Sequence, residues 1–354
     1  MIAPLPEGAA RQASQSMPEK PTSFDIAFLA GVSQPTVSRA LRGSPVVSLE
    51  TRKRIEAIAR QLNYRVDKNA SNLRSQHSNT LALLLFEDPT PDDSQINPFF
   101  LSMLGSITRA SARQGYDLLI SFQQLSKNWQ QDYEDSRKAD GIILLGYGDY
   151  EEYRPRLEQL VSQDTHFVRW GPVVTDEPGV SVGSDNAQGG FDVTRHLLSQ
   201  GRKRIAFLGN ATSHYPEFYD RFRGYARALH EAHLQPAPAL QVDAINLEES
   251  GLKAVHELRT RGVQFDAVVA ASDLIAIGAL SAMQAIGVDV PRDVAVVGFD
   301  DIPAACHTNP PLTTVMQDTR RAGELLVETL LRQITGDPVT NSVIPTRLVV
   351  RKSG

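Results

Sequence analysis

The feature that most constrains the fold is an alternation, from Thr80 onward, of short apolar runs with amphipathic segments. The apolar runs are TLALLLF, YDLLISF, DGIILLG, THFVRW, RIAFLGN, DAVVAAS and DVAVVGFDD, and helix-like segments such as FLSMLGSITRASARQG, GGFDVTRHLLSQG and LIAIGALSAMQAIG lie between them. Continuous apolar strands that alternate with helices are typical of parallel sheets covered on both faces. These units are too many for one sheet of ordinary size. The pattern therefore predicts an α/β body of two similar, doubly wound parallel-sheet lobes, with a ligand site in the cleft between them.

The length and composition fit a soluble protein of several domains. A chain of 354 residues is too long for one ordinary core. No apolar run approaches the roughly 18 residues that a membrane span needs, and residues 1–20 contain no apolar segment of the secretory kind. Their Pro, Ala, Ser and Gln content predicts a disordered tail. The single cysteine, Cys306, excludes an intrachain disulfide framework and fits a reducing cytoplasm.

A second pattern lies near the N-terminus, in the stretch FDIAFLAGVSQPTVSRALRG at 24–43. The small Ala27 allows two helices to cross closely, and Gly31 permits the left-handed backbone of a tight turn. Val37 follows at the position that fills the angle between the helices. The stretch predicts a helix–turn–helix, whose small core is completed by Ile26, Ala30, Val32, Ala40 and Leu41.

The ends of these helices also carry signals. Ser33 is expected to cap the second helix. Pro35 lies near the start of that helix, where the backbone N–H that proline lacks would have no partner within the helix. A third helix is expected in SLETRKRIEAIARQLNY, with Ser48 as its N-cap. Three short helices are therefore predicted between residue 22 and about residue 65.

The outer face of the second helix is polar and suits the major groove of DNA. Gln and Arg side chains can make bidentate contacts to adenine and guanine edges, while Ser and Thr bind phosphates. From the residues alone, an ordinary helical hairpin with a polar outside remains the alternative. The residues expected to contact DNA are Ser33, Gln34, Pro35, Thr36, Ser38, Arg39 and Arg42.

The distribution of charge agrees with a nucleic-acid contact at one end of the chain. Residues 1–78 hold 11 lysines and arginines against 6 acidic residues, whereas the rest of the chain holds 25 against 35. The first segment therefore has a net charge of +5 and the remainder −10. A basic segment on an acidic body is typical of nucleic-acid-binding proteins, although a solvated basic face would give the same count.

These motifs together resemble the LacI family of bacterial repressors. The resemblance begins with DIAFLAGVSQPTVSRALRG, VSLETRKRIEAIARQLNY and NASNLRS, and it continues through VGSDNAQGGFDVTRHLLSQGRKRIAFLGN, RFRGYARAL, ASDLIAIGAL, DVAVVGFDD and PPLTTVMQD. It covers about residues 22 to 350 in order. The family implies a helix–turn–helix headpiece, a hinge helix and a two-lobed core like that of periplasmic sugar-binding proteins.

The resemblance implies the following boundaries: a tail at 1–21, the headpiece at 22–66, a hinge helix or linker at 67–79, and the effector-binding and dimerisation body at 80–354. In the hinge, Leu73 falls on the position whose leucine wedges between base pairs in the minor groove and kinks the duplex. Val66 stands where the family usually has proline, so we expect a less rigidly positioned hinge. Arg42 stands where asparagine is common, so an additional phosphate contact is expected there.

The resemblance also implies an effector site in the cleft. Arg221 matches the arginine that clamps ligand hydroxyls, and Asp300 matches an acidic ligand acceptor at a strand end. Aromatic rings stack on the C–H faces of sugars, so the aromatic residues favour a carbohydrate, although core packing is the alternative for each ring. Asp273 is expected to be structural and to order the turn into the following helix. The expected effector-binding residues are Phe99, Phe100, Trp170, Arg221, Asn246, Ser272 and Asp300.

The expected partners are double-stranded operator DNA, a small-molecule effector of the sugar class and a second copy of the chain. Operators read by helix–turn–helix proteins are commonly palindromic because the protein is two-fold symmetric. The chain shows no leucine-heptad tail after its last strand, so a homodimer is expected, located in the cytoplasm at the nucleoid. A sugar is expected to release the operator, and a purine-type corepressor that strengthens DNA binding is the alternative.

Two other classes of protein fit less well. An enzyme would need more than the DD pairs at 92–93 and 300–301 or the histidines His230 and His233, which lie on a predicted solvated helix without a third ligand or a nucleophile. No phosphate loop or nucleophile elbow is present, so no catalysis, metal or cofactor is expected. A periplasmic sugar-binding protein would need an export signal and would have no use for a basic helix–turn–helix.

Overall fold

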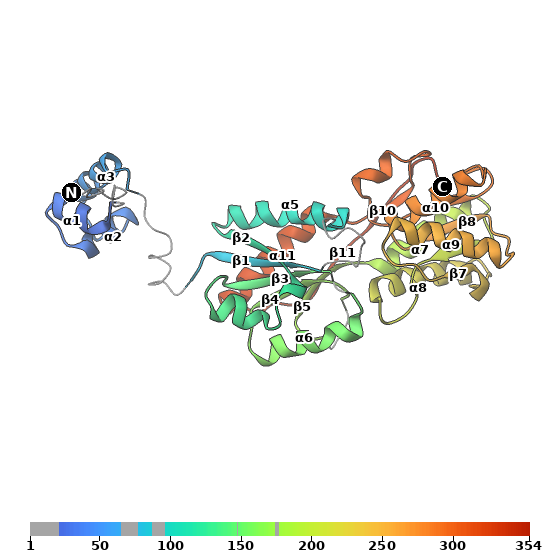
Figure 1. Ribbon diagram of the computed structural model, residues 1–354, viewed down its shortest axis with the longest axis horizontal. Coiled ribbons are helices and arrows are strands. Elements are labelled where there is room, and N and C mark those ends of the chain that lie inside the picture. The colour runs from blue at the N-terminus through green and yellow to red at the C-terminus, as the bar shows by residue number, and fades with distance from the viewer. Residues whose placement is uncertain (1–20, 65–76, 87–95, 147, 174–176) are drawn as a thin grey trace, which may run out of the picture. The chain divides into compact units, whose positions relative to one another are not determined.

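The structure is a computed structural model of the chain, and it describes residues 21–64, 77–86, 96–146, 148–173 and 177–354. The chain divides into two compact units, Met1–Gln76 and His77–Gly354. Figure 1 draws both units, and each is described here by itself.

The first unit contains the three predicted helices, α1 (Ser23–Ala30), α2 (Gln34–Leu41) and α3 (Leu49–Gln61). Thr22 caps α1 in a reciprocal arrangement with Asp25, which is the capping-box pattern. Gly31 ends α1 with a φ of 63°, the left-handed conformation that glycine adopts without steric cost. The buried residues form one small core, which comprises Ile26, Ala27, Ala30, Val37, Ala40, Val47, Ile55 and Ala59.

Two hydrogen-bond details complete this unit. One terminal nitrogen of Arg52 in α3 donates to the carbonyl oxygens of Gly43 (3.0 Å) and Ser44 (2.7 Å), so α3 is tied to the end of α2. Ser33 occupies the N-cap position of α2, as predicted. Its hydroxyl pairs with the hydroxyl of Thr36 at 2.8 Å and accepts no backbone N–H of the helix.

The second unit begins with a lobe built on a six-stranded parallel sheet in the order β11-β5-β4-β3-β1-β2. Alternate residues of each strand face opposite sides, so the apolar runs supply two separate cores. Helices α5 and α11 pack together over one face, and α6 covers the other. The elements are β1 (Thr80–Leu85), α5 (Pro98–Arg113), β2 (Asp117–Phe122), η1 (Gln123–Leu125), η2 (Gln130–Asp135), β3 (Gly141–Leu145), α6 (Tyr150–Ser162), β4 (Phe167–Trp170), β5 (Val180–Ser184), α11 (Thr319–Ile334) and β11 (Ser342–Ile344).

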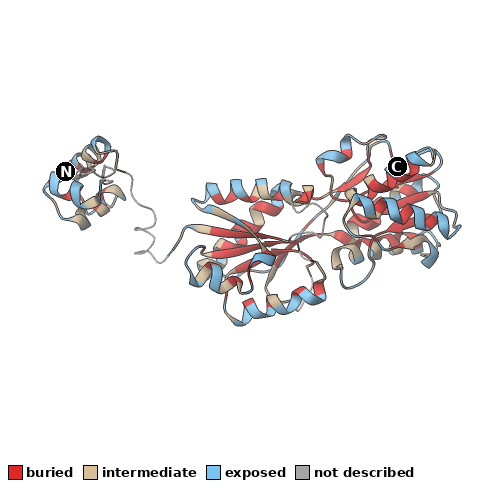
Figure 2. Cartoon of the chain, in the orientation of Figure 1, coloured by how far each residue is buried: buried red, intermediate tan, exposed pale blue. Residues whose placement is uncertain are grey.

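The other lobe of this unit has a four-stranded parallel sheet in the order β7-β6-β8-β9. Its helices pack in two pairs, α7 with α8 and α9 with α10. Figure 2 shows the central strands of both lobes buried and the outer helix faces exposed, whereas the edge strand β2 of the first lobe is partly exposed. The elements are α7 (Asn186–Ser199), β6 (Ile205–Leu208), α8 (Pro216–Glu231), η3 (Pro238–Leu240), β7 (Gln241–Val242), α9 (Glu248–Thr260), β8 (Ala267–Ala270), α10 (Asp273–Ala285), β9 (Ala295–Val297) and η4 (Pro303–Cys306).

Three chain passages join the two lobes. The first follows β5, and the other two contain β10 (Thr314–Met316) and β12 (Arg347–Val349), which pair antiparallel. Because α11 and β11 lie in the first lobe, that lobe contains segments from both ends of the unit. The predicted fold class, a helical headpiece followed by two parallel-sheet lobes, is confirmed. Within the described ranges, no helix combines the length and the apolar character that a membrane crossing requires.

Candidate functional site

The outer face of α2 carries the residues that the sequence assigned to DNA. Val37 and Ala40 are buried under the helix, whereas Pro35 and Arg39 are exposed. The exposed side chain of Arg39 is therefore free of the headpiece core and can reach outward. The division into an inner apolar face and an outer polar face is therefore confirmed, and the contacts to DNA stay a prediction.

Two of the predicted DNA-contacting side chains are held within the unit. Arg42 lies back along α2, with Nε donating to the Ser38 carbonyl (3.2 Å) and a terminal nitrogen donating to the Ser38 hydroxyl (2.8 Å). The amide of Gln34 donates to the hydroxyl of Ser23 at 3.2 Å. Either side chain would have to exchange these bonds for a contact to DNA. The hinge residues Val66 and Leu73 lie outside the described residues, as does nearly all of the predicted tail.

A cavity of about 310 Å³ lies between the two lobes of the second unit. It is bounded by the ends of strands and the first turns of helices from both lobes, which is where ligands of parallel α/β sheets bind. Its lining is Phe86, Asn97, Phe99, Phe100, Gly146, Gly148, Asp149, Trp170, Tyr215, Glu217, Phe218, Arg221, Ile245, Asn246, Leu247, Asp300 and Gln317. Six of the seven predicted effector residues therefore meet in one cavity.

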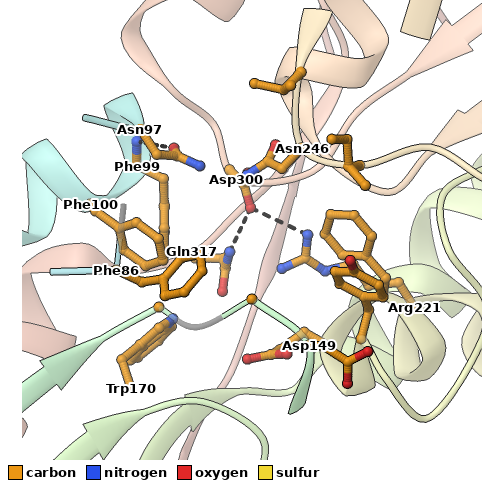
Figure 3. A pocket seen from close by; sticks show the side chains of 17 residues that line it. Phe86, Asn97, Phe99, Phe100, Asp149, Trp170, Arg221, Asn246, Asp300 and Gln317 are labelled. Carbon is orange, nitrogen blue, oxygen red and sulfur yellow. Dashed lines mark hydrogen bonds and ion pairs between the residues drawn. The ribbon is translucent and has the colours of Figure 1, made fainter. Parts of the chain in front are cut away.

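The first lobe supplies an aromatic wall, which Figure 3 shows on one side of the cavity. The ring of Phe99 lies 5.9 Å from that of Trp170 and 5.5 Å from that of Phe100, with tilted geometry in both pairs. Phe99 and Phe100 stand in the first turn of α5, where Asn97 caps the helix by accepting a bond from the Phe99 N–H at 3.0 Å. A side chain at Gly146 would collide with the ring of Phe100, so this glycine allows the ring to pack against the loop after β3.

Opposite the aromatic wall, an acidic group and two nitrogen donors form a polar cluster (Figure 3). Oδ1 of Asp300 accepts a hydrogen bond from the amide of Gln317 at 2.7 Å and lies 3.4 Å from a terminal nitrogen of Arg221. All three side chains are buried. The cluster can present a carboxylate, a guanidinium and an amide to a polar ligand, which suits hydroxyl groups.

Contacts with residues of the second lobe fix the orientation of the Arg221 side chain. Its Nε donates to Oδ1 of Asn186 at 2.8 Å, and a terminal nitrogen donates to the carbonyl of Ala271. The guanidinium also lies 3.8 Å from the centroid of the Phe299 ring, a cation–π contact. A side chain held at this many points loses little conformational freedom when a ligand binds.

Asp300 has two unusual properties. Burial raises the pKa of its carboxyl to about 6, against the lowering effects of the Arg221 charge and the Gln317 hydrogen bond. Its backbone also has a φ of 120°, a conformation that residues with a side chain rarely adopt. Strained backbone and perturbed carboxyl groups concentrate at functional sites, so both observations support a ligand-binding role.

Asn246 contributes a free acceptor to the cavity. Its Oδ1 is buried, and no described residue donates a hydrogen bond to it. A buried carbonyl oxygen without a donor is costly unless a bound group supplies one. The oxygen is therefore suited to receive a hydroxyl of a ligand.

The structure does not place Ser272 in the lining. Ser272 is fully buried and caps α10 by accepting a bond from the Ile275 N–H at 3.3 Å. The neighbouring Asp273 is structural, as expected, but it orders a more distant segment than its own turn. It accepts bonds from the Ile302 N–H (2.8 Å) and the Thr314 hydroxyl (2.5 Å).

Sequence reasoning missed several lining residues, and two of them matter most. Gln317 lies in the recognised stretch PPLTTVMQD but reaches Asp300 only because β10 runs beside the segment after β9. Asp149 caps α6 and pairs with Nδ1 of His214 at 2.6 Å, while the Tyr150 N–H donates to the His214 carbonyl at 2.9 Å. These two bonds join α6 of one lobe to the loop before α8 of the other. Each residue stands at a loop or helix start, a signal too common to single it out.

Comparison with known proteins identifies the chain. Residues 24–67 match bacterial regulatory proteins of the lacI family, and residues 194–354 match a periplasmic binding protein-like domain. The HTH-type transcriptional regulator CelR of Thermobifida fusca is 32% identical over 341 residues, which are 95% of this chain and 98% of that protein. The chain belongs to the LacI family. As a member of the LacI family it is a DNA-binding transcriptional regulator with an effector-binding domain, and the family is not enzymatic.

Solved structures of LacI-family members agree with the fold described above. A complex of the transcriptional regulator CelR with cellobiose is 31% identical, covers 94% of this chain and 100% of that chain, and superposes with a TM-score of 0.70. A lac repressor dimer bound to operator and the anti-inducer ONPF matches over 95% of this chain and 99% of that chain, with a TM-score of 0.81. Because the two sequences are only 24% identical, this match supports the fold alone. Among the described residues, no group of three His, Cys, Asp or Glu side chains could hold a metal ion.

Proposed function

We propose that this LacI-family regulator is a repressor of carbohydrate-utilisation genes, which binds a palindromic operator as a homodimer and is released by a sugar. The sugar would bind in the cavity between the two lobes. We further propose that the protein works in the cytoplasm, at the nucleoid.

The observation that carries the sugar assignment is the two-sided chemistry of the cavity. The rings of Phe99 and Trp170 offer apolar faces to the C–H side of a pyranose. The Asp300–Arg221 cluster faces them with the groups that bind vicinal hydroxyls. A charge-assisted hydrogen bond of this kind contributes about 1.5–3 kcal/mol. The unpaired Oδ1 of Asn246 adds an acceptor for a further hydroxyl.

One relative indicates which sugar to test first. The cavity of about 310 Å³ lies at the lower end of the range for ligand pockets, near 300 Å³, so it suits a small saccharide. The related CelR has been solved as a complex with cellobiose, a two-ring sugar. Cellobiose is therefore the first neutral sugar to test.

The DNA-binding half of the proposal depends on α2. Exposed Arg39 is positioned to contact a base edge, and Pro35 beside it faces outward. The residues expected in contact with DNA remain Ser33, Gln34, Pro35, Thr36, Ser38, Arg39, Arg42 and, in the hinge, Leu73. A dimeric relative solved on its operator supports a two-fold-symmetric mode of binding.

The lobes offer a physical route for release. The contacts of His214 with Asp149 and Tyr150 cross from one lobe to the other at the rim of the cavity. A sugar that contacts both lobes changes how far they close, and it shifts the DNA-binding state only if it prefers one arrangement of the lobes.

A nucleobase-type corepressor is the second candidate ligand, because the aromatic wall of Phe99 and Trp170 would also stack on a planar ring.

The test is a titration of the full chain onto labelled duplexes from the DNA beside its gene, followed by fluorescence anisotropy. We expect salt-sensitive binding with a preference for one palindromic duplex. The titration is then repeated with cellobiose, other neutral saccharides and purine bases. A sugar that weakens binding supports the proposal, and a base that strengthens it supports the corepressor alternative.

Two variants separate the halves of the proposal. Asp300→Asn should retain operator binding but respond only to higher concentrations of sugar, whereas Arg39→Ala should relax operator preference but still bind sugar. Arg60→Ala is the matched control for Arg39→Ala, because it removes the same charge from the exposed surface of α3. Absence of any preferred palindrome, with or without the small molecules, would contradict the repressor assignment.

A further inference from the structure

An arginine that none of the roles above uses lies inside the first lobe. Arg169 is the third residue of β4 and is 1% exposed. Its neighbour Trp170 points into the effector cavity, and Arg169 therefore points to the opposite face of the sheet, beneath α6. In the strand register, Leu144 of β3 and Ser181 of β5 flank it.

The polar atoms of this arginine have no hydrogen-bond partner among the described residues. None of its three nitrogens forms a hydrogen bond with a described residue, and no described carboxylate forms an ion pair with it. The hydroxyl of Ser181, which is also fully buried, has no hydrogen-bond partner in the described chain either. Because Arg169 and Ser181 are paired across neighbouring strands, their side chains leave the sheet on the same face.

A buried, uncompensated guanidinium needs an explanation. A buried carboxyl or amine can lose its charge by a shift in pKa, but arginine stays protonated at every pH at which proteins fold. Removing such a charge from water without a partner is strongly destabilising. Buried polar groups without protein partners are few in folded proteins, and bound ions account for some of them.

The groups around Arg169 only partly offset its charge. Its guanidinium carbon lies 5.6 Å from the ring centroid of Tyr150, at the edge of cation–π range. Burial raises the pKa of the phenols of Tyr150 and Tyr153, and the charge of Arg169 opposes that effect, so both phenols are neutral neighbours. Glu177 accepts a hydrogen bond from the Tyr150 hydroxyl.

We propose that Arg169 and Ser181 form a buried anion-binding site on the α6 face of the first lobe. The ligand chemistry is a carboxylate or phosphate group, whose oxygens match the planar fork of arginine and accept a further bond from a serine hydroxyl. Two sources can supply it: a free inorganic anion, or an organic acid or phosphate ester that binds here separately from the effector cavity. An anion here would lie under Tyr150, the first residue of α6, whose N–H joins the His214 carbonyl of the other lobe.

The test compares thermal unfolding of the wild-type chain and Arg169→Met in titrations of sodium phosphate, with sodium chloride at equal ionic strength as the reference. Methionine keeps most of the apolar volume and removes the charge. Arg156→Met is the matched control, because Arg156 is a partly exposed arginine of the same lobe that stacks on Trp129 at 4.9 Å. The expected result is a saturable phosphate-dependent rise in the melting temperature of the wild type and of Arg156→Met, which Arg169→Met lacks.

A second expectation follows from the uncompensated charge. At the lowest salt concentration, Arg169→Met should melt at a higher temperature than the wild type. If Arg169→Met fails to fold, Ser181→Ala takes its place and should require at least a severalfold higher phosphate concentration for half of the rise. Equal responses to phosphate in the wild type and in the variant that folds would overturn the proposal.

The source of the anion is found by adding glucose, glucuronate and glucose 6-phosphate in place of inorganic phosphate. A response to the two acidic sugars but not to inorganic phosphate assigns the site to an organic acid or phosphate ester, and a response to phosphate assigns it to a free anion. A response to none of these anions refutes the site. These measurements need no DNA, so their failure is distinguishable from a failure of the proposed repressor function.

Discussion

The carboxyl of Asp300 gives a quantitative prediction for the pH dependence of stability. Its ordinary pKa of 3.8 rises to about 6 in the folded protein, because burial outweighs the Arg221 charge and the Gln317 hydrogen bond. The difference of about 2 units corresponds to about 3 kcal/mol, at 1.36 kcal/mol per unit. The folded state binds the proton more tightly than the unfolded chain does. This contribution to stability is therefore fully present below about pH 4 and is lost as the pH rises through about 6.

The perturbation is Asp300→Asn, which keeps the shape of the side chain and can still accept the bond from Gln317, but has no proton to lose. We expect the free energy of unfolding of the wild type to fall by about 2.5 kcal/mol more than that of the variant between pH 4 and pH 7.5, because the carboxyl of the unfolded chain is already partly ionised at pH 4. Asp273, whose pKa burial also raises well above its ordinary value, is present in both proteins. Its contribution is therefore common to the two curves, apart from its coupling to Asp300.

The assay is urea unfolding followed by tryptophan fluorescence at several pH values. Both tryptophans of the chain, Trp129 and Trp170, are buried in the lobed unit, so the signal reports the unit that contains Asp300. Parallel curves of stability against pH for the two proteins would refute the reasoning, because they would mean that Asp300 does not titrate differently on folding.

The same carboxyl predicts how effector binding depends on pH. Sugar hydroxyls that donate to Asp300 favour its ionised form, and at pH 5 only about one tenth of a group with a pKa near 6 is ionised. The affinity of the wild type for an active sugar should therefore rise about tenfold between pH 5 and pH 7.5, with release of a proton on binding at the lower pH. Calorimetric titration of Asp300→Asn should give a weaker affinity with little pH dependence.

Three further predictions concern other parts of the chain. Arg39→Ala should cost about 1–3 kcal/mol of operator binding and relax sequence preference, which competition among mutated duplexes measures; an unchanged preference would contradict the readout role. Gly224→Ala should lower stability by about 1–3 kcal/mol and weaken sugar binding, because the added carbon would lie 2.0 Å from a carbonyl of α7 and would displace α8, the helix that carries Arg221. Gly105→Ala, on an open helix face, is the control and should raise stability in the same unfolding assay. His214→Ala removes the 2.6 Å contact with Asp149 and should change sugar affinity by up to about fivefold, the size expected for a half-exposed ion pair, with sugar-free operator binding unaltered in the anisotropy assay.

The elements that the sequence predicted well are those with local signals. The three headpiece helices follow from the cap at Ser48, the glycine at 31 and the apolar spacing, each of which acts within a few residues. The buried strands followed from continuous apolar runs. The prediction missed β5, whose sequence VSVGS includes two serines and a glycine, and the short strands β7, β10, β11 and β12. These strands depend on neighbours in the sheets and not on their own composition.

Some residues of the candidate site could be predicted from the sequence, and others could be found only in the structure. The resemblance to the LacI family supplied Arg221, Asp300 and the aromatic residues, and the structure brings them into one cavity. It also supplied Ser272, which instead serves as a helix cap. Gln317, Asp149 and His214 carried no signal of their own, because a single amide, acid or imidazole at a loop is common in any soluble protein.

The amino-acid sequence by itself determined the two kinds of unit, the helix–turn–helix and the class of protein, since periodicity, caps and motifs act over short stretches of chain. The tertiary structure alone decided that β10 returns beside the segment after β9, that a carboxyl buried there has a pKa near 6, and that Arg169 is enclosed without a hydrogen-bond partner in the described part of the chain. These properties depend on which distant segments exclude water from a side chain. Burial and pairing are set by packing across the whole fold, and no short stretch of sequence encodes them.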